Sequence, residues 1–318
     1  MARVRQTDTF GGWQVLSLRC YQEGLALRGV KPAAPVHPLA AERERAILFE
    51  FLVASICHGT NWDRLRLSLA DAASPEWFEA KKLAELSFSD FDRLLGAAFA
   101  GSSDLIERHQ MFTIAAGALE SSTSPLARSL LSPTPQRLAG STGLYALLDS
   151  VSMFTSDPNR KKSRILVQQL YRYRLLDFVD PENFQPATEY HLIRLYLRTE
   201  RVVHLDSLEF TADSTRAGDV RLVTALRQAV EQAMYYTADG AGMSVPELNE
   251  IEWQVARSYC ERRSPRCSGP PVESKPIDQA ILEVADGACP FEDSCRGPRR
   301  HRVARLTEPR LAEHHAYY

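Results

Sequence analysis

Four cysteines gathered near the C-terminal end of the sequence constrain this chain more than any other feature. Of the six cysteines in 318 residues, Cys20 and Cys57 stand alone, and the other four lie within 36 residues: Cys260, Cys267, Cys289 and Cys295. No apolar segment follows the basic stretch Met1–Gln6, so we expect no export signal. Clustered cysteines without an export signal favour metal binding over disulfides.

The spacing of these cysteines favours an iron–sulfur cluster. Six residues separate Cys260 from Cys267, 21 separate Cys267 from Cys289, and five separate Cys289 from Cys295. Zinc knuckles use about two to four residues within each pair. Wider loops are better suited to a 4Fe–4S cluster, whose irons each need one thiolate. We therefore predict a 4Fe–4S cluster held by these four cysteines, with zinc as the alternative.

Apolar residues recur at helical spacing along almost the whole chain. The periodicity predicts eight helical segments, which begin near Ile47, Ser89, Leu105, Leu144, Ile165, His191, Val220 and Ser244. Ser244 and Glu247 form a capping-box signature, and Ser89 is the expected N-cap of the second segment. We find no convincing β-hairpin signal, and only residues 201–205 weakly resemble a strand. The predicted fold class is therefore all-α.

Two segments carry a resemblance to a known family. The cysteine segment reads Cys-x6-Cys, then Cys-Pro-x-Glu-Asp-x-Cys, and residues 189–199 read EYHLIRLYLRT. They resemble two segments of the helix–hairpin–helix (HhH-GPD) DNA glycosylases of the endonuclease III and adenine glycosylase branch, C-x6-C-x2-C-x5-C and Asp-x-His-x2-Arg-x3-Arg-Thr. This chain differs by 19 extra residues between the cysteine pairs and by Glu189 in place of the family's catalytic aspartate.

The resemblance implies a two-lobed helical fold and an enzyme. One lobe would span residues 41–184, and the second, cluster-bearing lobe would combine residues 1–40 and 185–318. Such an enzyme flips a modified base out of duplex DNA and cleaves its N-glycosidic bond. Glu189 would stabilise the positive charge that grows on the sugar. An exposed acid favoured by the helix dipole is the other interpretation of Glu189.

Lys162 lies where family members with lyase activity carry a nucleophilic lysine, so the resemblance also implies possible strand cleavage. A lysine that attacks a sugar must be neutral, and therefore desolvated or close to other cations. Arg160, Lys161 and Arg164 are the neighbouring cations in the sequence. A solvated or phosphate-binding lysine is the alternative interpretation.

Further residues are assigned to DNA. His58 lies where the family has a glutamine that fills the gap left by the flipped base; the alternatives are a buried histidine bonded to a backbone carbonyl, or a pocket residue. The family's hairpin glycines are absent from residues 156–164, so side chains are expected to contact phosphate there. The predicted DNA contacts are His58, Arg160, Lys161, His191, Arg262, Arg263 and Arg266.

Composition limits the remaining choices. Lys and Arg number 38 against 40 Asp and Glu, so the whole-chain charge does not indicate a nucleic-acid binder. The sequence contains no run of 18 apolar residues, so we expect no membrane span. We expect a cytoplasmic monomer, nucleoid-associated if bacterial, that acts on double-stranded DNA with a modified base. The alternatives are a non-catalytic nucleic-acid-binding protein and an N-glycosidase acting on RNA or nucleosides. A third alternative is a helical interaction protein with no nucleic-acid role, stabilised by bound zinc or a cluster.

Overall fold

The computed structural model describes residues 8–73, 77–120, 124–206, 209–211, 217–295 and 301–311. It is mostly helical, with 54% helix and 4% strand, which confirms the predicted all-α class. None of the helices in these ranges is both long enough and apolar enough to cross a membrane.

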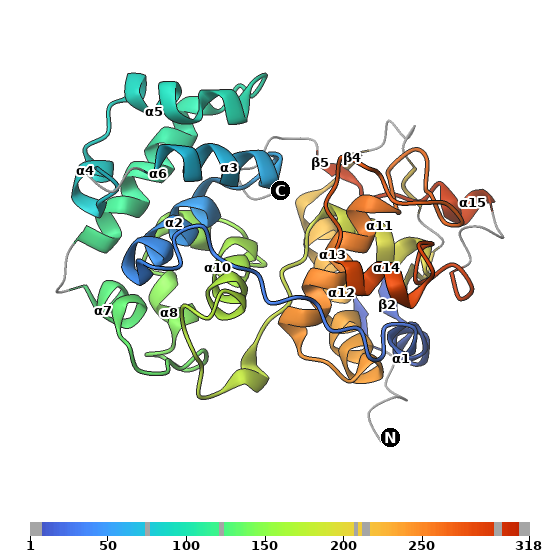
Figure 1. The fold of residues 1–318 in the computed structure, drawn as a ribbon. Coiled ribbons are helices and arrows are strands. Elements are labelled where there is room, and N and C mark those ends of the chain that lie inside the picture. The colour runs from blue at the N-terminus through green and yellow to red at the C-terminus, as the bar shows by residue number, and fades with distance from the viewer. Residues whose placement is uncertain are drawn as a thin grey trace. The chain divides into compact units, whose positions relative to one another are not determined.

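The chain divides into two compact units (Figure 1). Unit 1 combines Met1–Ala33 with Gln185–His315, and unit 2 contains Ala34–Phe184. The lobes expected from the sequence, residues 41–184 and residues 1–40 plus 185–318, have boundaries close to these.

Unit 2 is built around one buried helix, α2 (Arg43–Ile56). Every residue from Ala46 to Ile56 is buried, as expected for a helix surrounded by other helices. Helices α6 (Leu105–Glu120) and α10 (Lys161–Arg172) pack against it. The other described helices of this unit are α3 (Trp62–Ala72), α4 (Ala80–Ala84), α5 (Phe88–Leu95), α7 (Pro125–Leu131), α8 (Leu144–Leu148) and α9 (Ser152–Thr155), with 3₁₀ turns at Gly96–Phe99 and Pro181–Asn183.

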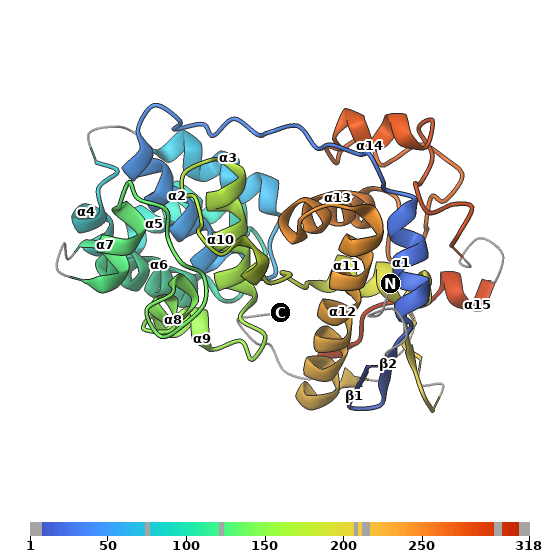
Figure 2. The ribbon, with the colours of Figure 1, turned by 90° about the horizontal axis from the view of Figure 1, so that it is seen from below.

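Unit 1 packs its N-terminal helix α1 (Ser17–Leu25) against the long helix α12 (Val220–Ala241), as Figure 2 shows. The two backbones touch: a Cβ at Gly24 would lie 2.2 Å from the Thr237 carbonyl oxygen, and one at Gly240 would lie 2.2 Å from that of Tyr21. The other elements are α11 (Tyr190–Arg198), α13 (Val245–Ser258), α14 (Gln279–Val284), α15 (His301–Ala304), an antiparallel sheet of β1 (Thr9–Phe10), β2 (Trp13–Val15) and β3 (Val202–His204), and a parallel pair of β4 (Ala217–Gly218) and β5 (Arg310–Leu311).

Two local predictions are wrong and two are confirmed. Strands β1 and β2 form a hairpin that the sequence analysis missed, and its turn uses Gly11 and Gly12 with φ of 50° and 89°, the conformation that Gly-Gly turns favour. The cap of α5 is Ser87, because its side chain accepts from the Asp90 amide, so the predicted cap at Ser89 is wrong. Strand β3 and the capping box that opens α13 are confirmed.

Candidate functional site

The four clustered cysteines line a single pocket in unit 1. Cys260 follows the end of α13, and the amide of Cys289 donates to the carbonyl of Cys267 at 3.2 Å, which joins the two cysteine pairs. Cys260, Cys289 and Cys295 are each 8% exposed, and Cys267 is half-buried. The extra residues between the pairs therefore do not keep the cysteines apart.

These extra residues fold back onto α13. The amide of Asp278 donates to the Gln254 side chain at 2.6 Å, and the Lys275 ammonium donates to the Arg257 carbonyl at 2.8 Å. Ile281 on α14 is fully buried. The insertion is thus an ordered part of unit 1 that leaves the cysteine pocket intact.

Helix α11 holds the cysteine segment through two arginines. The Arg198 guanidinium donates to the Cys260 sulfur at 3.4 Å and to the Arg262 carbonyl at 2.7 Å. Arg194 donates to the Cys260 carbonyl at 2.6 Å. In return, the Cys295 thiol donates to the Arg198 carbonyl at 3.5 Å. The two segments that carry the family resemblance therefore meet in the structure.

The donor set of the pocket fits a metal group. Burial raises the pKa of the Cys289 thiol well above its ordinary value, and the charges of Cys260, Cys267 and Cys295 raise it further. Four neighbouring thiolates therefore need a cationic partner. Among the described ranges, no three or more His, Cys, Asp or Glu side chains are grouped to hold one metal ion. All four cysteines nevertheless line one pocket, and four thiolates are a donor set that can hold a 4Fe–4S cluster or a zinc ion.

Glu189 is the N-cap of α11. Its Oε1 accepts from the amides of His191 at 2.9 Å and Leu192 at 3.2 Å, so the carboxylate is fixed at the positive end of the helix dipole. The neighbouring His191 ring interacts with the Arg194 guanidinium, with 2.6 Å between Nδ1 and Nη2. Burial, and then the charge of Arg194, hold the pKa of His191 well below its ordinary value. His191 therefore belongs to the arginine network of α11, and its predicted DNA contact stays a prediction.

Lys162 lies inside unit 2, so the interpretation as a solvated lysine is wrong. Its side chain is fully buried, and its Nζ donates to the Ser55 carbonyl at 2.7 Å. Arg108 donates to the adjacent Ile56 carbonyl at 2.5 Å, so two cations bind the last carbonyls of α2. Burial lowers the pKa of Lys162 to about 8. The amine is thus easier to deprotonate, as a nucleophile requires, but it is enclosed.

His58 is buried beside this pair, as one alternative interpretation held, but within the described residues its ring makes no hydrogen bond to a backbone carbonyl. The ring is 3% exposed, and its Nε2 lies 3.3 Å from the Asp104 carboxylate. Arg108 binds both oxygens of that carboxylate, at 2.8 and 2.9 Å. Burial lowers the pKa of His58 to about 2, and the charges of Lys162 and Arg108 contribute. The predicted role in filling a gap in DNA stays untested.

We expect His58 to make the protein acid-sensitive. The pKa of His58 in the folded state lies far below its ordinary value near 6.5. As the pH falls below about 6.5, His58 is therefore protonated only in the unfolded chain. The free energy of unfolding should therefore be lower by about 1.4 kcal/mol at pH 5.5 than at pH 7.5 from this residue alone. In urea denaturation, the free energy of unfolding of the His58→Asn variant should fall by about 1.4 kcal/mol less than that of the wild type between pH 7.5 and pH 5.5. The His109→Asn variant serves as the control. An unchanged pH dependence in His58→Asn would contradict the assignment.

In the turn before α10, backbone amides donate hydrogen bonds to a side chain of the same turn. The Asp157 carboxylate accepts from the amides of Asn159 at 3.0 Å and Lys161 at 2.8 Å. Arg160 adopts φ of 52°, in the left-handed region, and its exposed guanidinium pairs with Asp149 at 3.0 Å. Lys161 is only 6% exposed, so its predicted phosphate contact is wrong for this conformation. Of the two DNA contacts predicted in this turn, Arg160 remains accessible.

The arginines of the cysteine segment that are predicted to contact DNA are more accessible than Lys161. Arg263 and Arg266 are exposed. Arg262 is partly exposed and pairs with Glu308 at 3.1 Å. Glu308 also binds Arg194 at 2.9 Å, and sequence reasoning missed it because its partners lie far away in the chain. Their DNA contacts stay predictions.

Sequence reasoning also missed a buried ion network in unit 1. Arg201 and Glu252 form an ion pair in which both side chains are fully buried. The Arg201 guanidinium lies over the rings of Tyr196, at 3.7 Å, and Phe291, at 5.0 Å. Phe291 also lines the cysteine pocket, so the network connects the cysteine segment to the core of unit 1. No local sequence pattern indicates such pairings.

The structure brings the site residues together in two groups. In unit 1, the four cysteines lie against the helix that begins after Glu189, and in unit 2, Lys162 lies close to His58.

Comparison of the full sequence with protein-family models and with curated proteins yields no match.

Proposed function

We propose that this protein is a DNA N-glycosylase of the helix–hairpin–helix type, with a 4Fe–4S cluster on its four clustered cysteines. One observation carries the proposal: α11 has Glu189 at its N-terminus and binds the cysteine segment through Arg194 and Arg198 further along. Two segments that resemble the same family, far apart in the sequence, thus form one local assembly.

The side chains of the two segments suggest a role for each segment in the proposed reaction. Cys260, Cys267, Cys289 and Cys295 would hold the cluster, which when bound supplies a structural tie for their segment. Arg263 and Arg266, exposed on that segment, would contact DNA phosphates. Glu189, held by two amides, would stabilise the positive charge on the sugar and orient the attacking water. The substrate class is duplex DNA that carries a modified base.

Glu189→Gln tests the catalytic part of the proposal. Removing this charge should slow base release about 100-fold, while the glutamine oxygen can still cap α11 and DNA affinity is retained. The measurement is single-turnover release of free base from duplexes that carry oxidised, alkylated or deaminated bases. Glu247→Gln, which changes the first-turn carboxylate of α13, is the matched control and should release base at the wild-type rate.

The outcomes separate the proposal from its rivals. Full activity in Glu189→Gln would remove the carboxylate from the mechanism. No release from any duplex, together with salt-dependent duplex affinity, would favour a non-catalytic nucleic-acid-binding protein. The enclosure of Lys162, the lysine that the resemblance places as a nucleophile, argues against strand cleavage and leaves base release through Glu189 to this test. Release from RNA or nucleosides alone would favour the alternative N-glycosidase.

A further inference from the structure

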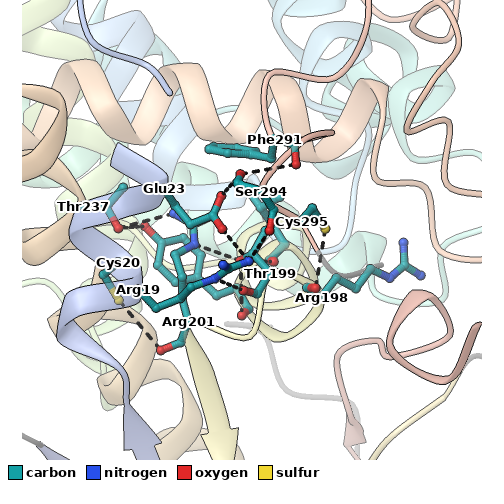
Figure 3. Close-up of polar contacts among 12 residues, drawn as sticks. Arg19, Cys20, Glu23, Arg198, Thr199, Arg201, Thr237, Phe291, Ser294 and Cys295 are labelled. Carbon is teal, nitrogen blue, oxygen red and sulfur yellow. Dashed lines mark hydrogen bonds and ion pairs between the residues drawn. The ribbon is translucent and has the colours of Figure 1, made fainter. Parts of the chain in front are cut away.

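Helix α1 reaches the turn that carries the last cysteine (Figure 3). Ser294 precedes Cys295, and its hydroxyl donates to the Glu23 carboxylate at 2.5 Å. The Arg19 guanidinium donates to the Ser294 carbonyl and pairs with Glu23 one turn along the helix, at 2.7 Å. Both the side chain and the backbone of Ser294 are therefore held by α1, a segment more than 260 residues earlier in the chain.

The same turn is held by α11 on another side. The Cys295 thiol donates to the Arg198 carbonyl at 3.5 Å, and Arg19 also donates to the Thr199 carbonyl at 3.2 Å. Arg19 thus joins the end of α11 to the cysteine turn. Glu23 is fully buried, and a buried carboxylate needs both its ion pair and its hydrogen bonds. The position of Ser294 is therefore determined by strong, directional contacts.

We propose that Glu23 and Ser294 are positioning residues for the iron–sulfur cluster. Glu23 acts through Ser294 to hold the Cys295 turn at the pocket wall, so that the fourth thiolate stays in place. This inference rests on the proposed cluster. It assigns to α1 a role in retaining the cluster, although α1 contributes none of the four cysteines.

The test compares Ser294→Ala and Glu23→Gln with matched controls in unit 2. Glu50→Gln changes another buried, ion-paired carboxylate, and Ser87→Ala removes a serine contact at a helix cap. The full-length protein is purified without oxygen and mixed with a chelator, and the visible absorbance and iron content are followed. Partners of metal ligands typically change metal retention about 10- to 100-fold. We expect the Ser294 and Glu23 variants to lose iron faster by this factor, and the controls to match the wild type even where they unfold more easily.

A conservative variant separates positioning from general stability. Ser294→Thr keeps the hydroxyl and should retain iron as the wild type does. Because Ser294 is partly exposed, its alanine variant tests the inference even if Glu23→Gln fails to fold. A brown wild type whose Ser294→Ala variant loses iron at the wild-type rate would overturn this inference alone. A wild type without iron would overturn the proposed cluster and this inference together.

Discussion

Protein purified without oxygen is expected to be brown and to contain about four irons and four acid-labile sulfides per chain, as a cluster on four thiolates requires. The Cys289→Ser variant should be colourless, because its side chain lies in the wall of the pocket, 8% exposed, and serine cannot replace the thiolate there. Without the cluster, the four cysteines that line the pocket lose the group that would tie their segments together. We therefore also expect Cys289→Ser to unfold at lower temperature than the wild type.

Cys20→Ser is the matched control for this experiment. Cys20 is fully buried and lies in the same unit as the four clustered cysteines, but it is absent from the pocket lining. Its thiol donates to the Arg201 carbonyl at 3.7 Å, and a serine hydroxyl can donate to the same carbonyl. Iron and sulfide should stay at wild-type levels in this variant. One zinc per chain with no iron in the wild type would contradict the cluster and leave a helical zinc protein.

Arg201→Met is expected to destabilise the folded protein by about 3–5 kcal/mol, the range for breaking one side of a buried ion pair. The variant leaves Glu252 fully buried without its cation. Burial already raises the pKa of Glu252 despite the charge of Arg201, which shows how costly the charged carboxylate is in this environment. Chemical denaturation at neutral pH measures the loss.

The double variant Arg201→Met/Glu252→Leu distinguishes an unpaired charge from lost packing. Replacing both charges with apolar groups should recover most of the stability, since such replacements of buried pairs are often close to neutral. If the double variant is as unstable as Arg201→Met, the cost comes instead from the packing of Arg201 on Tyr196 and Phe291. That outcome would contradict the ion-pair explanation.

Local signals in the sequence predicted the parts of this protein that depend on near neighbours. Helical periodicity predicted the fold class, and Ser244 with Glu247 predicted the start of α13, because a capping box involves residues three apart. The same reasoning placed the cap of α5 two residues late, since Ser87 and Ser89 carry similar signals and the hydrogen bond from the Asp90 amide to the Ser87 side chain distinguishes them. It also overlooked the hairpin at Gly11 and Gly12, whose strands are only two and three residues long.

By itself, the sequence determined that the chain is helical and which four cysteines belong together, because periodicity and spacing are local properties. Only the tertiary structure decided that the 19 extra residues fold back on α13, and that Lys162 is enclosed at the end of α2. It alone also paired Arg201 with Glu252 and Ser294 with Glu23. These outcomes depend on burial and on contacts between distant segments. A buried charge is stable only beside its partner, and that partner is not apparent from the linear order of residues.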